Sequence, residues 1–311
     1  MRLLLLGSSG FVGRELVPYL LELGHSLTLV SRRRQPFPPR PDDRLACLEG
    51  DPSDPSTWRR EELRQALAAA DGVVNLAGEP IAEKRWTPAH RQLLLDSRLR
   101  TTSQLVQAMA RLPQPPRVLV NASAIGYYGT SLEARFDEQS AAGEDFLGQL
   151  CQRWEQTALA APSPCRVVIL RLGIVLGPDG GALAKMLPVF RAGFGGPLGS
   201  GQQWMSWIHR HDLCRMIATA LEEPAWTGTY NAVAPEPTRM AIFAAALGRC
   251  LRRPSLLPVP GPILQLLLGD GAQVVLEGQQ VFPTHALAQG FHFQYPELNG
   301  ALAAATSPAP R

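Results

Sequence analysis

Three glycines near the N-terminus have the spacing of a phosphate-binding turn. They follow the apolar run Leu3 to Leu6 and precede a segment whose apolar residues have helical spacing. In a strand–turn–helix unit the first glycine permits a tight turn, the second lets backbone N–H groups approach a pyrophosphate, and the third lets helix and strand pack closely. A turn with a purely structural role is the alternative. The pattern predicts a dinucleotide site at Gly7, Ser9, Gly10, Phe11, Val12 and Gly13.

The residues after the second strand, Leu27 to Val30, select between nicotinamide dinucleotides. Ser31, Arg32 and Arg33 follow it directly, and the next carboxylate along the chain is Asp42. An acidic residue here would bond the ribose 2′-hydroxyl of NAD, whereas arginine accommodates the 2′-phosphate of NADP. A guanidinium can grip that phosphate with two hydrogen bonds. We therefore predict NADP(H), with NADPH preferred over NADH, although a solvated run of charge is the alternative.

Further cofactor contacts are expected at the ends of later strands. Ala77 and Gly78 follow the strand Val73 to Leu76 and would let the backbone lie against a cofactor. Asp51 could cap a turn near the adenine, and a plain turn role is equally compatible with its neighbours. Arg98 could reach an anionic group or a buried carboxylate. The additional predicted cofactor residues are Asp51, Leu76, Ala77, Gly78, Glu79, Arg98 and Ala122.

Alternating apolar patterns supply the framework for these residues. A helical pattern from Arg14 to Leu23 ends at Gly24, a position suited to a helix C-cap. Later strands are expected at Val73 to Leu76, Arg117 to Asn121 and Arg166 to Leu170, and helices at Leu93 to Leu112 and Gly148 to Ala161. This alternation predicts an α/β fold, a Rossmann doubly wound parallel sheet with helices on both faces.

The texture of the chain changes after Gly173, where glycine-rich loops surround a short helical pattern, Ala182 to Arg191. Candidate helices follow near Met240 to Arg249 and Pro262 to Leu268. We expect a dinucleotide-binding Rossmann domain from residues 1–172 plus about 205–232. A smaller C-terminal substrate lobe would contain residues 173–204 plus 233–311.

Composition limits the class of protein. The 311 residues are 45% apolar and 18% charged, which is typical of a globular chain rather than a disordered or fibrous one. A formal net charge of +3 is too small to argue for nucleic acid. Five scattered cysteines without a C-x-x-C pair fit reduced thiols, and no metal site is readable. No apolar run reaches the ~18 residues of a membrane span, so a cytoplasmic protein without a membrane partner is expected.

Several longer segments resemble a known family. They are Val74 to Ile81, Arg85-Trp86, Ser97-Arg98 with Thr101-Thr102, Ser123 to Gly129, Arg171 to Gly177, Gly195 to Gly201, Trp204 to His209, Asn231 to Pro235 and Gly278 to Pro283. With the glycine turn, they make the chain similar to the extended short-chain dehydrogenase/reductase superfamily. Within it, the chain resembles the epimerase-family proteins often labelled cell-division-inhibitor-like. The resemblance covers nearly the whole chain and implies an NADP-binding Rossmann domain, a small substrate lobe and a cleft between them.

The chain departs from that superfamily in its catalytic residues. The usual set is a Ser or Thr, a Tyr acid/base, and a Lys four residues later that lowers the Tyr pKa and holds the ribose. Neither Lys84 nor Lys185, the two lysines of the chain, has a Tyr four residues before it. Counting from the helix that contains Trp154 places Leu147 and Cys151 at the Tyr and Lys positions.

Proton transfer would then come from other groups. The usual Ser position falls on Ala124, with Ser123 one residue earlier, and Tyr127 and Tyr128 follow closely. We take Ser123 and Tyr127 as the candidate catalytic residues. The alternative is that these side chains only pack or position the nicotinamide, because aromatic residues mostly fill cores.

Candidates for the substrate cleft come from the segments that carry the resemblance. They are Arg85, Trp86, Trp204, Trp207 and His209. Tryptophan suits a flat or apolar ligand, and an imidazole can titrate near neutrality, although packing and a structural histidine are the alternatives.

Two functions remain open from the sequence. One is an NADP(H)-dependent oxidoreductase or epimerase-like enzyme that acts on an unknown small molecule. The other is a catalytically weak or inactive nucleotide-binding protein that acts through a partner, with cell division as one setting. The superfamily often dimerises through paired helices, so a homodimer is one expectation.

Overall fold

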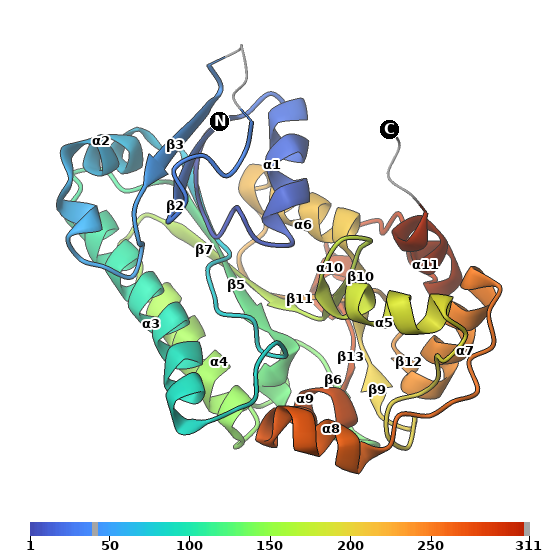
Figure 1. Cartoon of the computed structure of the whole chain (residues 1–311). Coiled ribbons are helices and arrows are strands. Elements are labelled where there is room, and N and C mark those ends of the chain that lie inside the picture. The colour runs from blue at the N-terminus through green and yellow to red at the C-terminus, as the bar shows by residue number, and fades with distance from the viewer. Residues whose placement is uncertain (39–42, 308–311) are drawn as a thin grey trace.

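Seven parallel strands form the central sheet, in the order β11-β7-β5-β4-β1-β2-β3 (Figure 1). The structure is a computed structural model that describes residues 1–38 and 43–307. The strands are β1 (Arg2–Leu6), β2 (Ser26–Ser31), β3 (Leu45–Glu49), β4 (Gly72–Asn75), β5 (Val118–Ala124), β7 (Arg166–Leu172) and β11 (Gly228–Ala232). The order runs outward in both directions from β1, which confirms the predicted doubly wound α/β fold. In such sheets, ligands bind at the point where the order reverses.

Pairing in register brings three chain segments to this point. Leu6 of β1 lies opposite Val30 of β2 and Asn75 of β4. The residues that follow these strands therefore leave the sheet side by side, although they are far apart in the sequence.

Helices cover both faces of the sheet (Figure 1). On one face lie α1 (Gly13–Glu22) and α6 (Arg210–Glu222), and on the other lie α2 (Glu61–Ala69), α3 (Pro88–Ala110) and α4 (Phe146–Leu159). In β1, Leu3 and Leu5 point into the first layer, and Leu4 and Leu6 point into the second. All four are at most 2% exposed, and this two-sided burial explains why the strand is an unbroken apolar run.

Local signals set the ends of two helices. Gly24 follows α1 with φ of +86°, the left-handed conformation expected of a glycine beyond a helix end. Helix α3 begins five residues before the predicted start at Leu93. The Thr87 side chain accepts a hydrogen bond from the His90 N–H, and Pro88 occupies the first turn. Both features favour a helix start.

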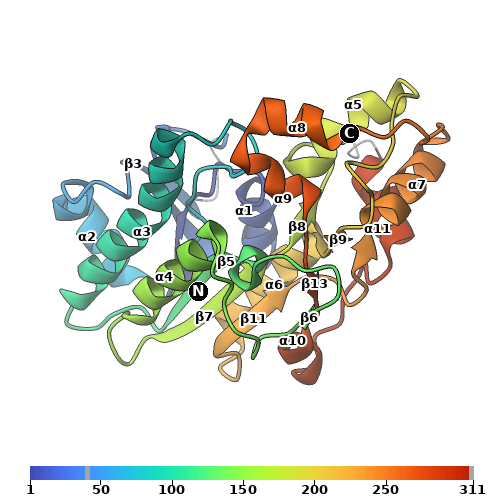
Figure 2. The same cartoon turned by 90° about the horizontal axis from the view of Figure 1, so that it is seen from below.

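A second core lies beside the sheet. It is built by β8 (Ile174–Leu176), β9 (Trp204–Met205), β10 (Trp207–His209), β12 (Thr238–Arg239), α5 (Gly181–Arg191), α7 (Met240–Leu251) and α11 (Leu298–Thr306). We call these elements the lobe. Two short helices, α8 (Gly261–Leu268) and α9 (Gln273–Leu276), lie between α3 and the lobe helices α5 and α7 (Figure 2).

The sequence predicts that residues 233–311 belong to the lobe, but only part of this segment packs there. Strand β13 (Gln280–Val281) pairs with β6 (Arg135–Phe136), and α10 (Thr284–Ala288) packs on the sheet. Phe291 contacts Trp226, which stacks on Tyr230 of β11 at 4.3 Å between ring centroids. These rings pack in the core on the face of the sheet that α1 and α6 cover. At the open edge of β11, the Glu138 carboxylate accepts the Asn231 N–H and so pairs a backbone group of the edge strand.

Across residues 1–38 and 43–307, no helix combines the length and apolar character needed to cross a bilayer.

The packing of the glycine turn gives a test of the fold. A Cβ on Gly13 would lie 2.0 Å from the Ser8 carbonyl oxygen, so α1 must shift to accept it. We expect Gly13→Ala to lower the free energy of unfolding by about 1–3 kcal/mol in urea denaturation. Gly300→Ala is the matched control, since no atom lies within 4 Å of its Cβ, and it should add up to about 1 kcal/mol. Equal losses in the two variants would contradict the close packing at Gly13.

Candidate functional site

A groove of about 680 Å³ runs along the carboxyl ends of β1, β2 and β4. The predicted residues that line it are Gly7, Ser9, Gly10, Ser31, Arg32, Arg33, Asp51, Leu76, Ala77, Gly78 and Glu79. They come from four separate segments, which the parallel register of the sheet brings together. The groove therefore brings together most of the residues that the turn and strand-end patterns predict as cofactor contacts.

The glycine turn forms one end of the groove. Gly7 has φ of +75°, and a Cβ on it would lie 2.6 Å from the Leu76 carbonyl carbon. Only glycine allows the turn after β1 to pass this close to the end of β4. The Gly10 N–H donates to the Gly7 carbonyl at 3.1 Å, which tightens the turn ahead of α1. Helix α1 starts three residues after Gly10, and a helix N-terminus carries the positive potential that suits phosphate.

The edge beyond β2 is cationic. The Arg32 and Arg33 side chains are exposed and line the groove, and the Ser31 hydroxyl accepts a hydrogen bond from the Arg33 N–H at 3.1 Å. Asp51 is also on the wall, but its carboxylate accepts from both the N–H and the hydroxyl of Ser53. That is the turn role named above as the alternative. Asp42 lies outside the described residues.

The opposite wall is one face of α3, which sequence reasoning did not identify. The residues are Leu93, Asp96, Ser97, Arg100 and Thr101. Their spacing of three and four places them on one side of a helix, so the periodicity of α3 was the signal that could have found them. Ser97 also accepts the Glu79 N–H at 3.0 Å and so fixes the strand end opposite.

Five predicted cofactor residues lie away from the groove lining: Phe11, Val12, Gly13, Ala122 and Arg98. Val12 precedes the first turn of α1, Gly13 packs on the Ser8 backbone, and Ala122 is buried within β5. The Phe11 ring instead packs against Gly177, Gly180 and Gly181, where any Cβ would come within 3.0 Å of it. These residues stabilise the glycine turn and the elements packed against it, and they do not form the surface of the groove.

Arg98 lies behind the loop that follows β4. Its guanidinium donates to the carbonyls of Leu94 and Glu79 and lies 5.3 Å from the Trp154 ring centroid. The side chain is 8% exposed and lines a second cavity next to the groove. Arg98 therefore supports the loop residues of the groove wall from the cavity side.

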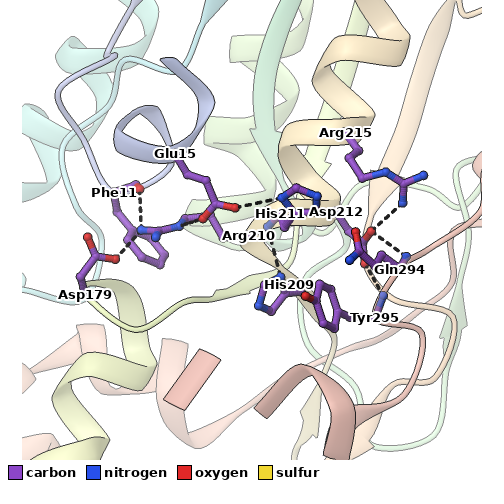
Figure 3. Close-up of polar contacts among 10 residues, drawn as sticks. All are labelled: Phe11, Glu15, Asp179, His209, Arg210, His211, Asp212, Arg215, Gln294 and Tyr295. Carbon is purple, nitrogen blue, oxygen red and sulfur yellow. Dashed lines mark hydrogen bonds and ion pairs between the residues drawn. The ribbon is translucent and has the colours of Figure 1, made fainter. Parts of the chain in front are cut away.

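Arg210 ties the turn to the lobe (Figure 3). Its guanidinium donates to the Phe11 carbonyl at 3.1 Å and lies 4.6 Å from the Phe11 ring centroid. It also pairs with Glu15 in the first turn of α1 and with Asp179 in the loop between β8 and α5. One buried cation thus holds three elements around the base of the turn.

Two predicted cleft residues are buried elsewhere, which corrects the prediction. Trp207 is fully buried in the core of the lobe. His209 is 8% exposed, its ring lies 4.0 Å from that of Tyr295, and its Nδ1 accepts the His211 N–H to begin α6 (Figure 3). Burial lowers the pKa of His209 to about 4, so its imidazole is neutral at physiological pH. Both side chains stabilise the lobe and do not face a ligand.

The second cavity has a volume of about 210 Å³. Its wall includes Ile81 and Arg98, the sequence neighbours of Pro80 and Ser97 in the groove lining. Leu147 and Cys151 of α4, at the positions that carry Tyr and Lys in the superfamily, both line it. Trp204 contributes to the lobe side. The other predicted cleft residues, Arg85 and Trp86, belong to the loop ahead of α3. The backbone N–H of Trp86 donates to the Leu268 carbonyl of α8.

Neither predicted catalytic residue lines this cavity. Ser123 is 3% exposed and donates to Glu155 at 2.6 Å, and Glu155 forms two hydrogen bonds of 2.8 Å with Arg171. The Tyr127 ring centroid lies 3.4 Å from the Arg171 guanidinium carbon, and the Tyr128 hydroxyl accepts from the same guanidinium. Both predicted residues therefore serve a buried ion pair, which is the packing role named as their alternative.

The acid–base groups on the cavity wall, besides Arg98, are one thiol and two carboxylates, those of Cys151, Asp145 and Glu277. Burial raises the pKa of the Cys151 thiol to about 11, so it stays protonated. The Asp145 carboxylate caps α4 by accepting the Gly148 N–H at 2.7 Å. No group of three or more metal-ligating side chains occurs in the described part of the chain.

Comparison with known proteins places this site in a family. The model of the NAD dependent epimerase/dehydratase family matches residues 3–233. The chain belongs to this family. A domain of unknown function, DUF1731, matches residues 259–305, so the resemblance seen in the sequence extends through the C-terminal segment.

Relatives of known name align over almost the whole chain. The epimerase family protein SDR39U1 homolog, chloroplastic, of Arabidopsis thaliana is 44% identical over 96% of this chain and 84% of its own. Human epimerase family protein SDR39U1 is 40% identical over 97% and 98% of the two chains.

Solved structures of family members have the same architecture. Human SDR39U1 (isoform 2) with NADPH matches with a TM-score of 0.86 and 38% identity, covering 98% of this chain and 99% of that one. A nucleoside-diphosphate sugar epimerase from Corynebacterium glutamicum matches with a TM-score of 0.75 and 28% identity, covering 98% of this chain and 58% of that one.

The buried His209 gives a pH test. Its pKa is about 4 when folded and about 6.5 when unfolded, so between these values the unfolded chain binds a proton that the folded chain does not. Stability therefore falls as the pH decreases from 6.5 to 4, by up to about 3 kcal/mol. His209→Asn keeps a capping side chain but does not titrate.

Urea denaturation at pH 7 and at about pH 4.5 measures this difference. The unfolding free energy of the wild type should drop more on acidification than that of His209→Asn. The exposed His292, changed to Asn, is the matched control and should behave as the wild type. Parallel losses in the wild type and His209→Asn would show that His209 does not carry this pH dependence.

Proposed function

We propose that this protein binds NADP(H), with preference for NADPH, and acts as an oxidoreductase or epimerase-like protein on a small molecule. The observation that carries the proposal is the edge of the groove after β2. Arg32 and Arg33 stand there, where an enzyme that uses NAD would carry a carboxylate. The human relative solved with NADPH supports the same choice of nucleotide.

The residues present fit such a nucleotide. Backbone N–H groups of the Gly7 to Gly13 turn would hold the pyrophosphate at the start of α1. Arg32 and Arg33 would hold the 2′-phosphate, and Leu76 to Gly78 offer a wall with little side-chain bulk. When bound, NADPH supplies a hydride donor. The residues of the chain bind and orient it, and the neighbouring cavity receives the reacting molecule.

A nucleotide-binding protein with little turnover, acting through a partner, is the second candidate function. Leu147 and Cys151 favour it, because they stand where the superfamily has its acid/base pair. No Tyr or Lys lines the cavity within the described residues. The Ser123 hydroxyl is held by Glu155, so it does not replace them. Proton transfer would then fall to the carboxyl groups of the wall, Asp145 and Glu277, or to water.

Titration of protein fluorescence with NADPH and with NADH tests the proposal. We expect tighter binding of NADPH, and a loss of about tenfold or more for NADPH in Arg32→Ala, because a charge-assisted hydrogen bond is worth about 1.5–3 kcal/mol. NADH binding should not change. Arg34→Ala is the matched control, since Arg34 is exposed but does not line the groove.

Two results would overturn this assignment. If Arg32→Ala weakened NADH and NADPH equally, the arginine would not read the 2′-phosphate. If neither nucleotide bound to the wild type, the groove would have a structural role only.

A further inference from the structure

We infer that the cavity beside the groove takes a small, uncharged and largely apolar molecule, and not a nucleoside diphosphate sugar. The inference deepens the proposed function by naming the substrate class of the same site, and it rests on that function only for the hydride chemistry.

The size of the cavity limits the ligand. Its volume of about 210 Å³ is below the ~300–1,000 Å³ usual for drug-sized ligands. Ile81 of the loop after β4, together with Gln273 and Val274 of α9, closes part of its wall. A molecule of one small ring fits this space better than a sugar that carries a nucleotide.

The walls are mostly aliphatic. Side chains without polar atoms come from α4, from the ends of β5 and β8, and from α9. They include Ala124, Leu147, Leu150, Ile174 and Val274. Trp204 adds an aromatic surface, with Arg239 lying 3.8 Å from its ring centroid. Burying an apolar ligand against such walls is favourable at roughly 25 cal/mol per Å².

Hydrogen-bond donors of the wall are already paired within the protein. Thr130 donates to Glu277 at 2.7 Å, and Ser206 donates to the Gln279 carbonyl while it accepts the Val281 N–H. The Gln279 side-chain amide donates to the Ile125 carbonyl. A sugar would find few free donors here for its oxygen atoms, and each buried oxygen without a partner costs free energy.

Charge argues against a diphosphate. Arg98 is the sole cation on the wall among the described residues, and its guanidinium is committed to the Leu94 and Glu79 carbonyls. The other charged residues of the wall, Asp145 and Glu277, are carboxylates. A free guanidinium or ammonium favours the binding of a diphosphate, and this wall offers none among the described residues.

Cations at the rim are also committed. Arg85 donates to the Leu266 carbonyl of α8, and Lys185 of α5 donates to the Ala82 carbonyl at 2.8 Å. Lys84 pairs with Glu79. These contacts link the loop at residues 81–86 to α5 and α8. The positive charges near the cavity therefore have partners within the protein and are not free to bind an anion.

Ligand-observed NMR on protein saturated with NADPH tests the inference, with cyclohexanone and UDP-glucose as the two probes. We expect saturation transfer to cyclohexanone and none to UDP-glucose. Leu147→Gln should weaken cyclohexanone binding at least tenfold, because it places an amide on the apolar wall. Leu159→Gln is the matched control on the same helix, since Leu159 is 54% exposed. If Leu147→Gln fails to fold, Val274→Asn tests the opposite wall.

The outcomes separate the substrate class from the proposed function. UDP-glucose binding that Leu147→Gln abolishes would overturn the inference, and so would the absence of cyclohexanone binding to the wild type. A fluorescence titration with NADPH on the same samples reports cofactor binding independently. Protein that binds cyclohexanone but not NADPH would refute the proposed function and leave the class of ligand standing.

Discussion

The in-register pairing of β1 between β2 and β4 is the constraint on which the site depends. It requires β1 to be apolar on both faces and forces the turn at Gly7 to pass against the Leu76 backbone. Because the three strands end together, the glycine turn, the arginines after β2 and the loop after β4 meet in one groove. The shape of the groove is thus a consequence of the strand pairing. The side chains of the arginines after β2 then favour one nucleotide over another.

Several polar residues of β5 and the segment after it have a structural role rather than a catalytic one. The ion pair between Glu155 and Arg171 is buried and draws in Ser123 and both tyrosines of the Tyr127-Tyr128 pair. A buried pair of this kind is costly to break, because removing one partner leaves an unpaired charge. The polar residues that look reactive in the sequence therefore stabilise the protein interior. The surface of the cavity itself is mostly apolar.

Local patterns predicted the features that have local causes. The apolar run of β1, the glycine turn and the arginines after β2 were all readable, because each depends on neighbours in the sequence. β3 was missed, since an edge strand is only half buried and shows little alternation. The partners of Ser123 and Trp207, and the return of Phe291 to the sheet, depend on residues far along the chain. Residue type alone could not say which tryptophan faces a ligand.

Arg210 makes four positions dependent on one another. Phe11, Glu15 and Asp179 each contact its guanidinium, and they belong to the turn, to α1 and to the lobe. Substitutions at residues that share a partner are not additive, so the effect of each depends on the state of the others. Physically, the set behaves as one coupled unit, because replacing the arginine would leave Phe11 and the glycine loop around it without the cation that holds them.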